Sequence, residues 1–255
     1  MQYFYKKNIL IIGASQGIGK ATALLLSQYQ CKLWLSARNE TALQSLCKQI
    51  NDAGVSSALY SVCDVSDENS VADTIQKATS EFGAIDIAII NAGINGSEGN
   101  HFDSNVFKNI YSVNINGILH SLQYLLPAMQ TQGGVIAGVT SLADFRGVPG
   151  SGAYTSSKTA ASFILEAVRY EVLSENIRIL TIKPGFVSTN MTADIKYKMP
   201  FIISPEKAAT YIVKGIAKEK PIIAFPKIVS IASTIGKIMP LWLFKLLFSK
   251  GEYKF

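Results

Sequence analysis

Charged residues, histidine and cysteine are all scarce in this sequence. Only 16% of its 255 residues are charged and 48% are hydrophobic, a composition that excludes an intrinsically disordered chain and favours a large buried core. The two histidines, His101 and His120, are not spaced like metal ligands, so we expect no metal site. The three cysteines, Cys31, Cys47 and Cys63, form no CxxC pair, which is typical of buried, reduced thiols in a cytosolic protein.

Apolar runs long enough to cross a membrane are also missing. The run NILIIG at residues 8–13 is too short for a secretion signal and predicts a buried first strand instead. Lysines and Pro240 interrupt the apolar residues of 227–255, so we expect no spanning helix there. The predicted location is therefore the cytoplasm, with association to a membrane surface as the alternative.

Excess positive charge is absent from most of the chain. Residues 1–195 contain 13 Lys and Arg against 15 Asp and Glu, a net charge of −2, whereas residues 196–255 contain 11 Lys against 3 Glu, a net charge of +8. The total of +6 is thus a property of the C-terminal segment. A nucleic-acid partner is not expected, because the excess of basic residues is confined to the C-terminal segment.

Short apolar runs alternate with helical patterns along the chain. This alternation predicts a parallel sheet covered on both faces, and right-handed crossovers favour a single Rossmann-type, doubly wound α/β domain. Ligands of such sheets bind at the carboxyl ends of the strands. The expected strands are 8–13, 31–37, 57–65, 85–93, 133–141 and 177–185, and the expected helices are 19–29, 39–52, 67–83, 103–131 and 152–174.

A glycine-rich turn, IIGASQGIGKA, joins the first predicted strand to the first helix. Its glycines, Gly13, Gly17 and Gly19, have the spacing G-x3-G-x-G. Glycine permits a positive φ in a tight turn and lets the backbone approach a pyrophosphate at a helix N-terminus. Between a strand and a helix the triplet predicts a dinucleotide-binding site, with a purely structural turn as the alternative.

A carboxylate is missing where the ribose 2′-hydroxyl of NAD would be bound. The second predicted strand ends in Ser36, Ala37 and Arg38, and no acidic residue there can accept the hydrogen bond that is typical of NAD sites. The guanidinium of Arg38 can instead pair with a 2′-phosphate. The sequence therefore favours NADP(H) and leaves NAD(H) and an ordinary solvent-exposed arginine as alternatives.

Four motifs follow one another in the chain: the glycine-rich turn, NAG at 91–93, Ser141, and Tyr154 with Lys158 four residues later. In this order and spacing the sequence resembles the classical short-chain dehydrogenase/reductase family over residues 7–224. The resemblance implies an oxidoreductase that transfers hydride between a nicotinamide and a carbonyl or secondary alcohol. It also implies a homodimer or homotetramer formed through the helices at 103–131 and 152–174.

The resemblance also implies a role for each matching residue. The expected catalytic residues are Asn114, Ser141, Tyr154 and Lys158. The residues expected to bind the cofactor are Gly13, Ser15, Gln16, Gly17, Ile18, Gly19, Arg38, Asp64, Val65, Asn91, Ala92, Gly93, Tyr154, Lys158, Pro184, Gly185 and Thr189.

Within this set, Asp64 and Val65 are expected at the adenine, and Pro184, Gly185 and Thr189 at the nicotinamide. The sequence departs from the family pattern at three positions. Isoleucine stands at 12 and 90, where the family usually has threonine and asparagine, and glutamine stands at 16, where a basic residue often supports NADP. The preference for NADP therefore rests on the arginine at 38 alone.

Carbonyl reduction explains why these residue types are needed. The negative charge that develops on the carbonyl oxygen requires a proton donor and a second hydrogen bond, which we expect from Tyr154 and Ser141. An isolated tyrosine has a pKa of about 10, and the ammonium of Lys158 together with an oxidised nicotinamide would lower that value. Asn114 is expected to connect Lys158 to solvent through a water molecule.

Two segments are expected to shape the substrate end of the site, residues 142–152 after Ser141 and a mobile lid at about 186–205. The substrate is expected to be apolar, because four large apolar side chains fall in these segments: Phe145, Phe186, Met191 and Phe201. Generic packing is the alternative explanation for them.

Residues 227–255 extend beyond the expected catalytic domain at 1–226, with isoleucines at helical spacing and lysines between them. We expect a helical extension that packs over the lid or on a neighbouring subunit, and the alternative is an interfacial helix on anionic lipid. Two other functions stay open: a non-catalytic NADP-binding regulator, and a membrane-surface reductase of keto-lipids.

Overall fold

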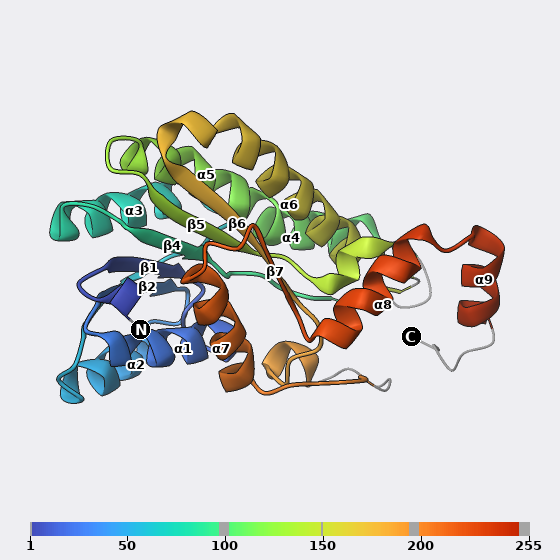
Figure 1. Ribbon diagram of the computed structural model, residues 1–255, viewed down its shortest axis with the longest axis horizontal. Coiled ribbons are helices and arrows are strands. Elements are labelled where there is room, and N and C mark those ends of the chain that lie inside the picture. Colours follow the sequence, from blue (N-terminus) through green and yellow to red (C-terminus); the bar gives the residue numbers. More distant parts are fainter. Residues whose placement is uncertain (1, 97–101, 149, 194–198, 250–255) are drawn as a thin grey trace.

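A parallel β-sheet occupies the centre of the molecule (Figure 1). The computed structural model of the chain describes residues 2–96, 102–148, 150–193 and 199–249. Within them, the sheet has seven strands in the order β3-β2-β1-β4-β5-β6-β7, all parallel. The strands are β1 (Asn8–Ile12), β2 (Lys32–Ala37), β3 (Ser57–Val62), β4 (Ile87–Ile90), β5 (Gly134–Val139), β6 (Ile177–Pro184) and β7 (Ile222–Phe225). The predicted doubly wound α/β fold is confirmed.

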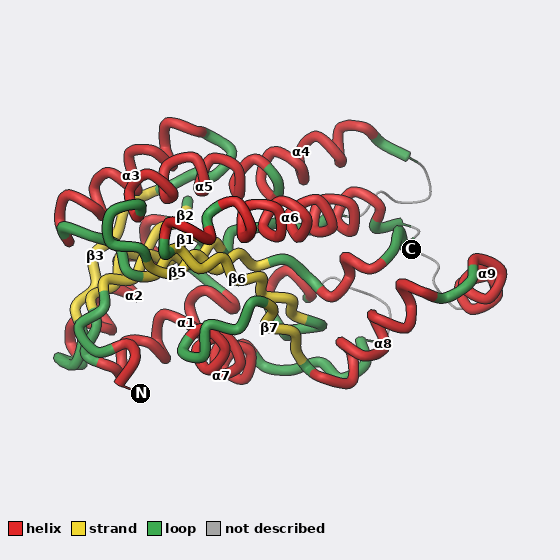
Figure 2. Tube along the Cα trace, turned by 45° about the horizontal axis from the view of Figure 1, so that its top comes forward, coloured by secondary structure: helices red, strands yellow, loops and turns green. Residues whose placement is uncertain are grey.

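Helices cover both faces of the sheet, as Figure 2 shows. One face is covered by α1 (Gly17–Leu26), α2 (Glu40–Asp52) and α7 (Pro205–Ile216). The other is covered by α3 (Glu68–Phe82), α4 (Ser104–Asn114), α5 (Asn116–Met129) and α6 (Gly152–Glu171). Strand side chains alternate between the two faces, so Ile9 and Ile11 of β1 join one hydrophobic core while Leu10 and Ile12 join the other.

The strand order reverses direction at β1, which lies between β2 and β4. In open α/β sheets, ligands bind at such a switch point, outside the carboxyl ends of the strands. The backbone N–H groups of Asn91 and Ala92, after β4, both donate to the carbonyl of Ile12, at 2.8 and 2.9 Å. These two bonds hold the ends of β1 and β4 together where the glycine-rich turn begins.

Two helices differ from the sequence-based expectation. The single helix expected at 103–131 is two helices, because α4 ends at Asn114 and α5 begins at Asn116. The Asn114 side chain bonds both the N–H and the carbonyl of Ile94 in the loop after β4, so the break lies where α4 is attached to that loop. The helix expected at 152–174 ends at Glu171, and a 3-10 turn follows at Leu173–Glu175.

The C-terminal segment forms α8 (Lys227–Ile238) and α9 (Leu241–Ser249), which are separated at Pro240. Figure 1 shows α8 beside the end of the sheet and α9 projecting away from the body of the molecule. In the part of the chain that the structure describes, no helix is both long and apolar enough to span a bilayer.

Candidate active site

A cavity of about 950 Å³ opens at the carboxyl ends of the strands. Its walls come from the segments that follow β1 to β6, from the first turns of α6 and from α8. Pockets for small-molecule ligands have this size and this position in α/β folds. The switch point between β1 and β4 lies in one of these walls.

The glycine-rich turn forms one wall, and close backbone packing excludes side chains from it. Gly13 has a φ of +90°, and a Cβ atom on it would lie 2.6 Å from the backbone nitrogen of Ala92. A Cβ atom on Gly19 would overlap the carbonyl oxygen of Gly13, which also accepts a 2.7 Å hydrogen bond from the Asn91 side chain. The side chain of the N-cap residue Gln16 does not cap the start of α1. This bare helix N-terminus, open to the cavity, fits the pyrophosphate of a dinucleotide.

The side chain of Arg38 lies at the end of β2 and is exposed at the edge of the cavity. Next to it, Asn39 caps α2 by accepting a 3.0 Å bond from the N–H of Ala42. A cation beside a helix N-terminus is a favourable place for an anion. Asp64, opposite, uses its Oδ1 atom to accept two bonds from Ser66, and the Ser66 hydroxyl holds the pKa of that carboxyl below its usual value.

Tyr154 and Lys158 lie one turn apart on α6 and both line the cavity. Residues four apart share one face of a helix, and the Lys158 Nζ atom lies 5.9 Å from the centre of the Tyr154 ring. The ammonium also donates to the carbonyl of Val139 at 3.2 Å. The lysine is therefore held beside the phenol at the end of β5.

Burial lowers the pKa of Lys158 to about 8, because desolvation disfavours the charged form of the amine. Only 4% of the residue is exposed. The pKa still lies above 7, so most of these side chains carry a positive charge at neutral pH. A titration so close to neutrality is a property that functional lysines share.

Asn114 lies behind the wall of the cavity, not in it. Its Nδ2 atom donates to the carbonyl of Ile94 at 2.9 Å and to the Ser157 hydroxyl at 3.0 Å, and its Oδ1 atom accepts from the Ile94 N–H at 2.8 Å. A Cβ atom on Gly93 would lie 3.0 Å from Lys158 Nζ and 3.2 Å from Asn114 Oδ1. Asn114 thus connects α4, the loop after β4 and α6 immediately next to the buried lysine.

Ser141 follows β5 and begins the 3-10 turn η3 (Leu142–Phe145). Its Oγ atom accepts a 3.0 Å bond from the N–H of Ala143. Because this bond uses the oxygen as an acceptor, the hydroxyl hydrogen can be donated to a ligand in the cavity.

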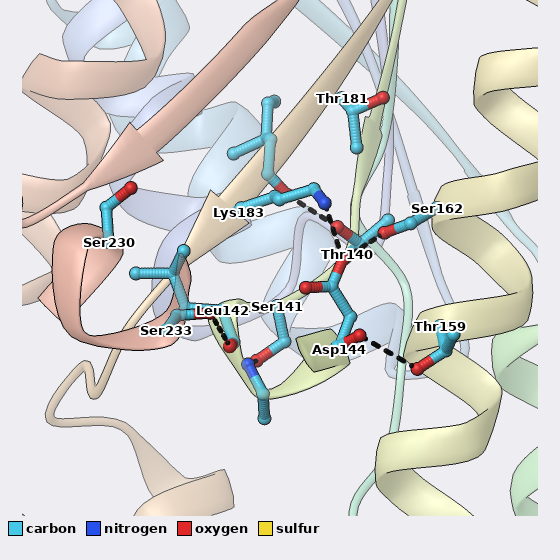
Figure 3. A network of polar contacts seen from close by, with 12 residues as sticks. Thr140, Ser141, Leu142, Asp144, Thr159, Ser162, Thr181, Lys183, Ser230 and Ser233 are labelled. Atoms are coloured by element: carbon cyan, nitrogen blue, oxygen red, sulfur yellow. Dashed lines mark hydrogen bonds and ion pairs between the residues drawn. The ribbon is translucent and has the colours of Figure 1, made fainter. Parts of the chain in front are cut away.

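A partly buried ion pair fixes η3 to its surroundings (Figure 3). Asp144 Oδ2 accepts from Lys183 Nζ at 2.7 Å and from the Ser162 hydroxyl at 2.5 Å, and the carbonyl of Asp144 accepts from Thr159 Oγ1 at 3.1 Å. The side chain of Asp144 is 8% exposed and that of Lys183 is 22% exposed. These bonds connect η3 to α6 and to the end of β6, the segments that surround the centre of the cavity.

The segment expected as a lid contacts the glycine-rich turn. The Asn190 side chain donates to the Oε1 atom of Gln16 at 2.9 Å, and Thr189 forms a capping box with Thr192 around the short turn η5 (Asn190–Thr192). Part of the expected lid, residues 194–198, lies outside the described residues. The described part closes the cavity over the start of α1.

The C-terminal helix α8 forms the remaining wall of the cavity. Val229, Ala232 and Ser233 line it, and the Ser233 hydroxyl donates to the carbonyl of Leu142 at 2.9 Å. The Arg146 side chain donates to the carbonyl of Met239 at 2.7 Å. Helix α8 is therefore packed on η3 and lines the cavity.

Most of the predicted site residues meet in this one cavity. Gly19 and Asn114 are the exceptions, since they support the wall from behind. Of the four apolar residues expected at the substrate end, Phe201 alone is not among the lining residues. The predicted residues that line the cavity are Gly13, Ser15, Gln16, Gly17, Ile18, Arg38, Asp64, Val65, Asn91, Ala92, Gly93, Phe145, Ser141, Tyr154, Lys158, Pro184, Gly185, Phe186, Thr189 and Met191.

Sequence reasoning missed the Asp144–Lys183 ion pair and the part played by α8. No local spacing indicates the ion pair, because its partners lie on η3 and β6. A signal for α8 was present in the alternation of small residues, such as Ala232 and Ser233, with isoleucines, which indicates a helix with two different faces.

Metal-binding groups do not gather anywhere in the described residues, where no cluster of three or more His, Cys, Asp or Glu could hold an ion. The Nδ1 atom of His120 lies 3.0 Å from the carbonyl of Val65, and His101 lies outside the described residues. Cys31, Cys47 and Cys63 are buried free thiols whose pKa values are raised by burial.

Comparison with known proteins gives consistent matches over most of the chain. The family model for short chain dehydrogenases matches residues 7–200. An oxidoreductase from Myxococcus xanthus that carries no more specific name is 30% identical over 236 residues, which are 92% of this chain and 93% of that protein. An NADP-dependent 3-hydroxy acid dehydrogenase from Schizosaccharomyces pombe is 30% identical over 231 residues, with 85% and 89% covered.

Solved structures share the fold. A short-chain type dehydrogenase/reductase from Mycobacterium marinum has a TM-score of 0.81 and 25% identity, with 94% of this chain and 98% of that chain covered. A short chain dehydrogenase/reductase from Burkholderia phymatum, in complex with NAD, has a TM-score of 0.84 over 98% of both chains. At 20% identity, this second likeness concerns the fold alone.

Proposed function

The chain belongs to the short chain dehydrogenase family, and from this premise we propose that it is an NADP(H)-dependent reductase or dehydrogenase of an apolar carbonyl or secondary-alcohol substrate. Members of the family are oxidoreductases that act on CH–OH and C=O groups with NAD(P). The observation that carries the proposal is that Ser141, Tyr154 and Lys158 meet in the cavity that also contains the glycine cradle.

Tyr154 is the proposed proton donor to the substrate oxygen in reduction and the base in oxidation. A bound nicotinamide supplies or accepts the hydride, so the protein has to move only the proton and stabilise charge on oxygen. The Ser141 hydroxyl is proposed to donate the second hydrogen bond to that oxygen. Its acceptor bond from Ala143 supports this role, because the bond orients the hydroxyl oxygen without using its hydrogen.

Lys158 is proposed to lower the pKa of the phenol through its ammonium and to hold the ribose next to the nicotinamide. Asn114 is proposed to keep Lys158 in place and to connect it to solvent. Its three side-chain bonds to Ile94 and Ser157 support the positioning part of this role. Pro184, Gly185 and Thr189 are proposed to hold the nicotinamide.

The experiment that tests the proposed function follows NADPH oxidation over a panel of ketones, keto-lipids and quinones. Tyr154→Phe should lower kcat by about 100-fold or more and leave NADPH binding, measured by fluorescence titration, unchanged. Tyr5→Phe is the matched control, because Tyr5 is exposed and does not line the cavity. NADPH binding without turnover on any substrate would favour the second candidate, a non-catalytic NADP-binding regulator. Near-normal turnover of Tyr154→Phe would refute the mechanism.

A preference for NADP(H) over NAD(H) is proposed on the basis of Arg38. Arg38→Gln should raise the KM for NADPH by about tenfold, since a charge-assisted hydrogen bond contributes roughly 1.5–3 kcal/mol, and should change the KM for NADH less than twofold. Lys48→Gln is the control, because Lys48 lies on α2, pairs with Asp52 and does not line the cavity. Equal changes in the KM values for NADPH and NADH would contradict the proposed preference.

An apolar substrate is supported by Phe145, Phe186 and Met191 at the far end of the cavity and by Val229 on α8. The long-chain members of the substrate panel should therefore have lower KM values than their short-chain analogues. Turnover of small polar ketones alone would contradict this assignment.

Self-association is proposed through α5 and α6, with a location in the cytoplasm. Leu119, Phe163 and Tyr170 are exposed large apolar side chains on these helices, and three reduced cysteines fit a reducing compartment. Light scattering of the purified protein should give a dimer or tetramer, and Phe163→Glu should lower its mass. A monomer at micromolar concentration would exclude this interface.

A further inference from the structure

Helix α8 has two apolar faces, and among the residues that the structure describes only one of these faces is covered. Val229, Ser233 and Gly236 face the cavity and η3. On the opposite side lie four exposed isoleucines. At about 100° per residue these four fall within an arc of about 80° on the helix surface, and they are Ile228, Ile231, Ile235 and Ile238.

Large exposed apolar side chains also occur at the start of α9, three and four residues after Ile238. Leu241 is 72% exposed, Trp242 is 69% exposed and Ile238 is 79% exposed. Isolated exposed apolar residues are common, but a contiguous group of large ones marks an interaction surface. We call the four isoleucines together with Leu241 and Trp242 the C-terminal apolar face.

Positive charge surrounds this face, and negative charge is absent from the sequence around it. Lys227, Lys237 and Lys245 are exposed, and no Asp or Glu occurs between Glu219 and Glu252. Two copies of the chain that met through this face would bring these lysines together with no carboxylate from the same segment to pair with them. The charge therefore disfavours a second copy as the occupant and favours an anionic surface.

We propose that the C-terminal apolar face docks on an anionic phospholipid surface, with its isoleucines and Trp242 at the headgroup boundary and its lysines near the phosphates. The helices α8 and α9 are too short to span a bilayer, but an amphipathic pair of helices with lysines and a tryptophan is suited to lie in the interface. Figure 1 shows both helices at the end of the molecule, outside the layers that cover the sheet.

Docking in this orientation would bring the cavity close to the membrane, because the other side of α8 is its wall. This consequence rests on the proposed function. The docking makes long-chain carbonyl compounds that partition into the bilayer the expected substrates. Such compounds would enter the cavity beside α8 without passing through water.

Co-sedimentation with large unilamellar vesicles tests the docking without any turnover. The full chain should bind vesicles of phosphatidylcholine mixed with phosphatidylglycerol, should bind pure phosphatidylcholine more weakly, and should be partly released at high salt. Ile231→Glu with Ile235→Glu should weaken binding at least tenfold, since burial of one isoleucine corresponds to about tenfold in an equilibrium constant. Lys227→Gln with Lys237→Gln should weaken binding to the anionic vesicles only.

Tyr5→Glu with Val55→Glu is the matched control, because both side chains are exposed and their segments lie at the opposite end of the molecule (Figure 1). This double variant should bind like the unaltered protein. If the two glutamates unfold α8, Ile238→Ser repeats the test with a milder change. Ile238 is the most exposed residue of the face. Absence of vesicle binding, or equal binding by the isoleucine and control variants, would overturn the proposal. So would a lower molecular mass of the isoleucine variants in light scattering, which would identify the face as a contact between copies.

Tyr154→Phe separates the two proposals. It should bind vesicles normally and yet be inactive. If the unaltered protein binds vesicles but reduces no ketone, the proposed function fails and the docking stands. If it reduces soluble ketones but ignores vesicles, the docking fails and the proposed function stands.

Discussion

The two ends of the cavity are built from different kinds of contact. At the proposed cofactor end, backbone packs against backbone: Gly13 against Ala92, and Gly19 against the carbonyl of Gly13. At the proposed substrate end, side chains from η3, α6 and α8 meet, and the Asp144–Lys183 ion pair holds η3 to β6 behind the lining residues. Backbone contacts tolerate no added atom, whereas side chains can rearrange. The proposed cofactor end should therefore tolerate few substitutions, and the proposed substrate end should tolerate more.

Replacement of one glycine by alanine at each end tests this difference most directly. Gly19→Ala should destabilise the fold by about 3 kcal/mol or more and abolish NADPH binding, because its Cβ atom would overlap a carbonyl that cannot move. Gly236→Ala places a Cβ atom 2.6 Å from the ring of Phe145, which can turn away. It should change the substrate KM and leave the NADPH dissociation constant unaltered. Urea unfolding and fluorescence titration measure both effects, and similar losses at the two sites would contradict the comparison.

Lys158 lies between the two ends, and its replacement should have opposite effects on activity and stability. The pKa of the amine is lowered from 10.5 to about 8 in the folded protein, so between these values the unfolded chain binds more protons and stability rises with pH. Below pH 8 the burial of the charge costs about 3 kcal/mol. Lys158→Met should therefore raise the free energy of unfolding at pH 7 by about 2 kcal/mol, after loss of the bond to Val139, and lower kcat by about 100-fold.

The measurement is urea unfolding at pH 7 and at pH 10. Between the two values the unaltered protein should gain stability relative to Lys158→Met. The two proteins are compared with each other because the buried cysteines, whose pKa values are raised, lower the stability of both equally at alkaline pH. Lys183→Met is unsuitable as a control because it breaks an ion pair, so Lys108→Met, on the surface helix α4, serves instead. If the difference in the free energy of unfolding between the unaltered protein and Lys158→Met is the same at both pH values, the buried lysine does not titrate in this range.

Asp144→Asn tests the substrate end alone. It removes the charge that pairs with Lys183 and keeps the oxygen that accepts from Ser162. We expect a loss of about 2 kcal/mol in stability, because one partner of a largely buried pair is left behind, and a decrease in kcat of a few fold through movement of η3. The dissociation constant of NADPH should stay unchanged. The double variant with Lys183→Met should lose less than the sum of the single losses, and strict additivity would show that the pair is not coupled.

The geometry of the glycine-rich end of the cavity is easier to predict from the sequence than that of the opposite end, for a physical reason. Gly13, Gly17 and Asn91 lie in short motifs between consecutive elements, where local spacing determines the geometry. Asn114 was identified by resemblance, but its position behind the wall depends on a break between α4 and α5 that periodicity did not reveal. The Asp144–Lys183 pair joins residues from separate elements, and no periodicity in the chain encodes such a contact.

The structure of the C-terminal segment could be predicted only in part. The isoleucines at helical spacing indicated a helix, and Pro240 indicated its end, and both features are present in α8 and α9. Which side of α8 would be covered could not be predicted, since small residues and isoleucines can each pack on a core. The answer depends on the position of η3, whose Leu142 carbonyl binds Ser233.

Asn190 connects the two ends, and its replacement should have the smallest effect. Its side chain bonds Gln16 at 2.9 Å across the mouth of the cavity, and an exposed hydrogen bond of this kind contributes only about 0.5–1.5 kcal/mol. Asn190→Ala should therefore lower the free energy of unfolding by about 1 kcal/mol at most. It should also raise the KM for NADPH about threefold, because the lid loses its contact with the glycine-rich turn. Gln16→Ala should give the same increase, and the double variant no further increase, because all three remove one bond. If instead the two increases multiply in the double variant, each side chain acts on the cofactor separately, and the lid and the glycine-rich turn are independent.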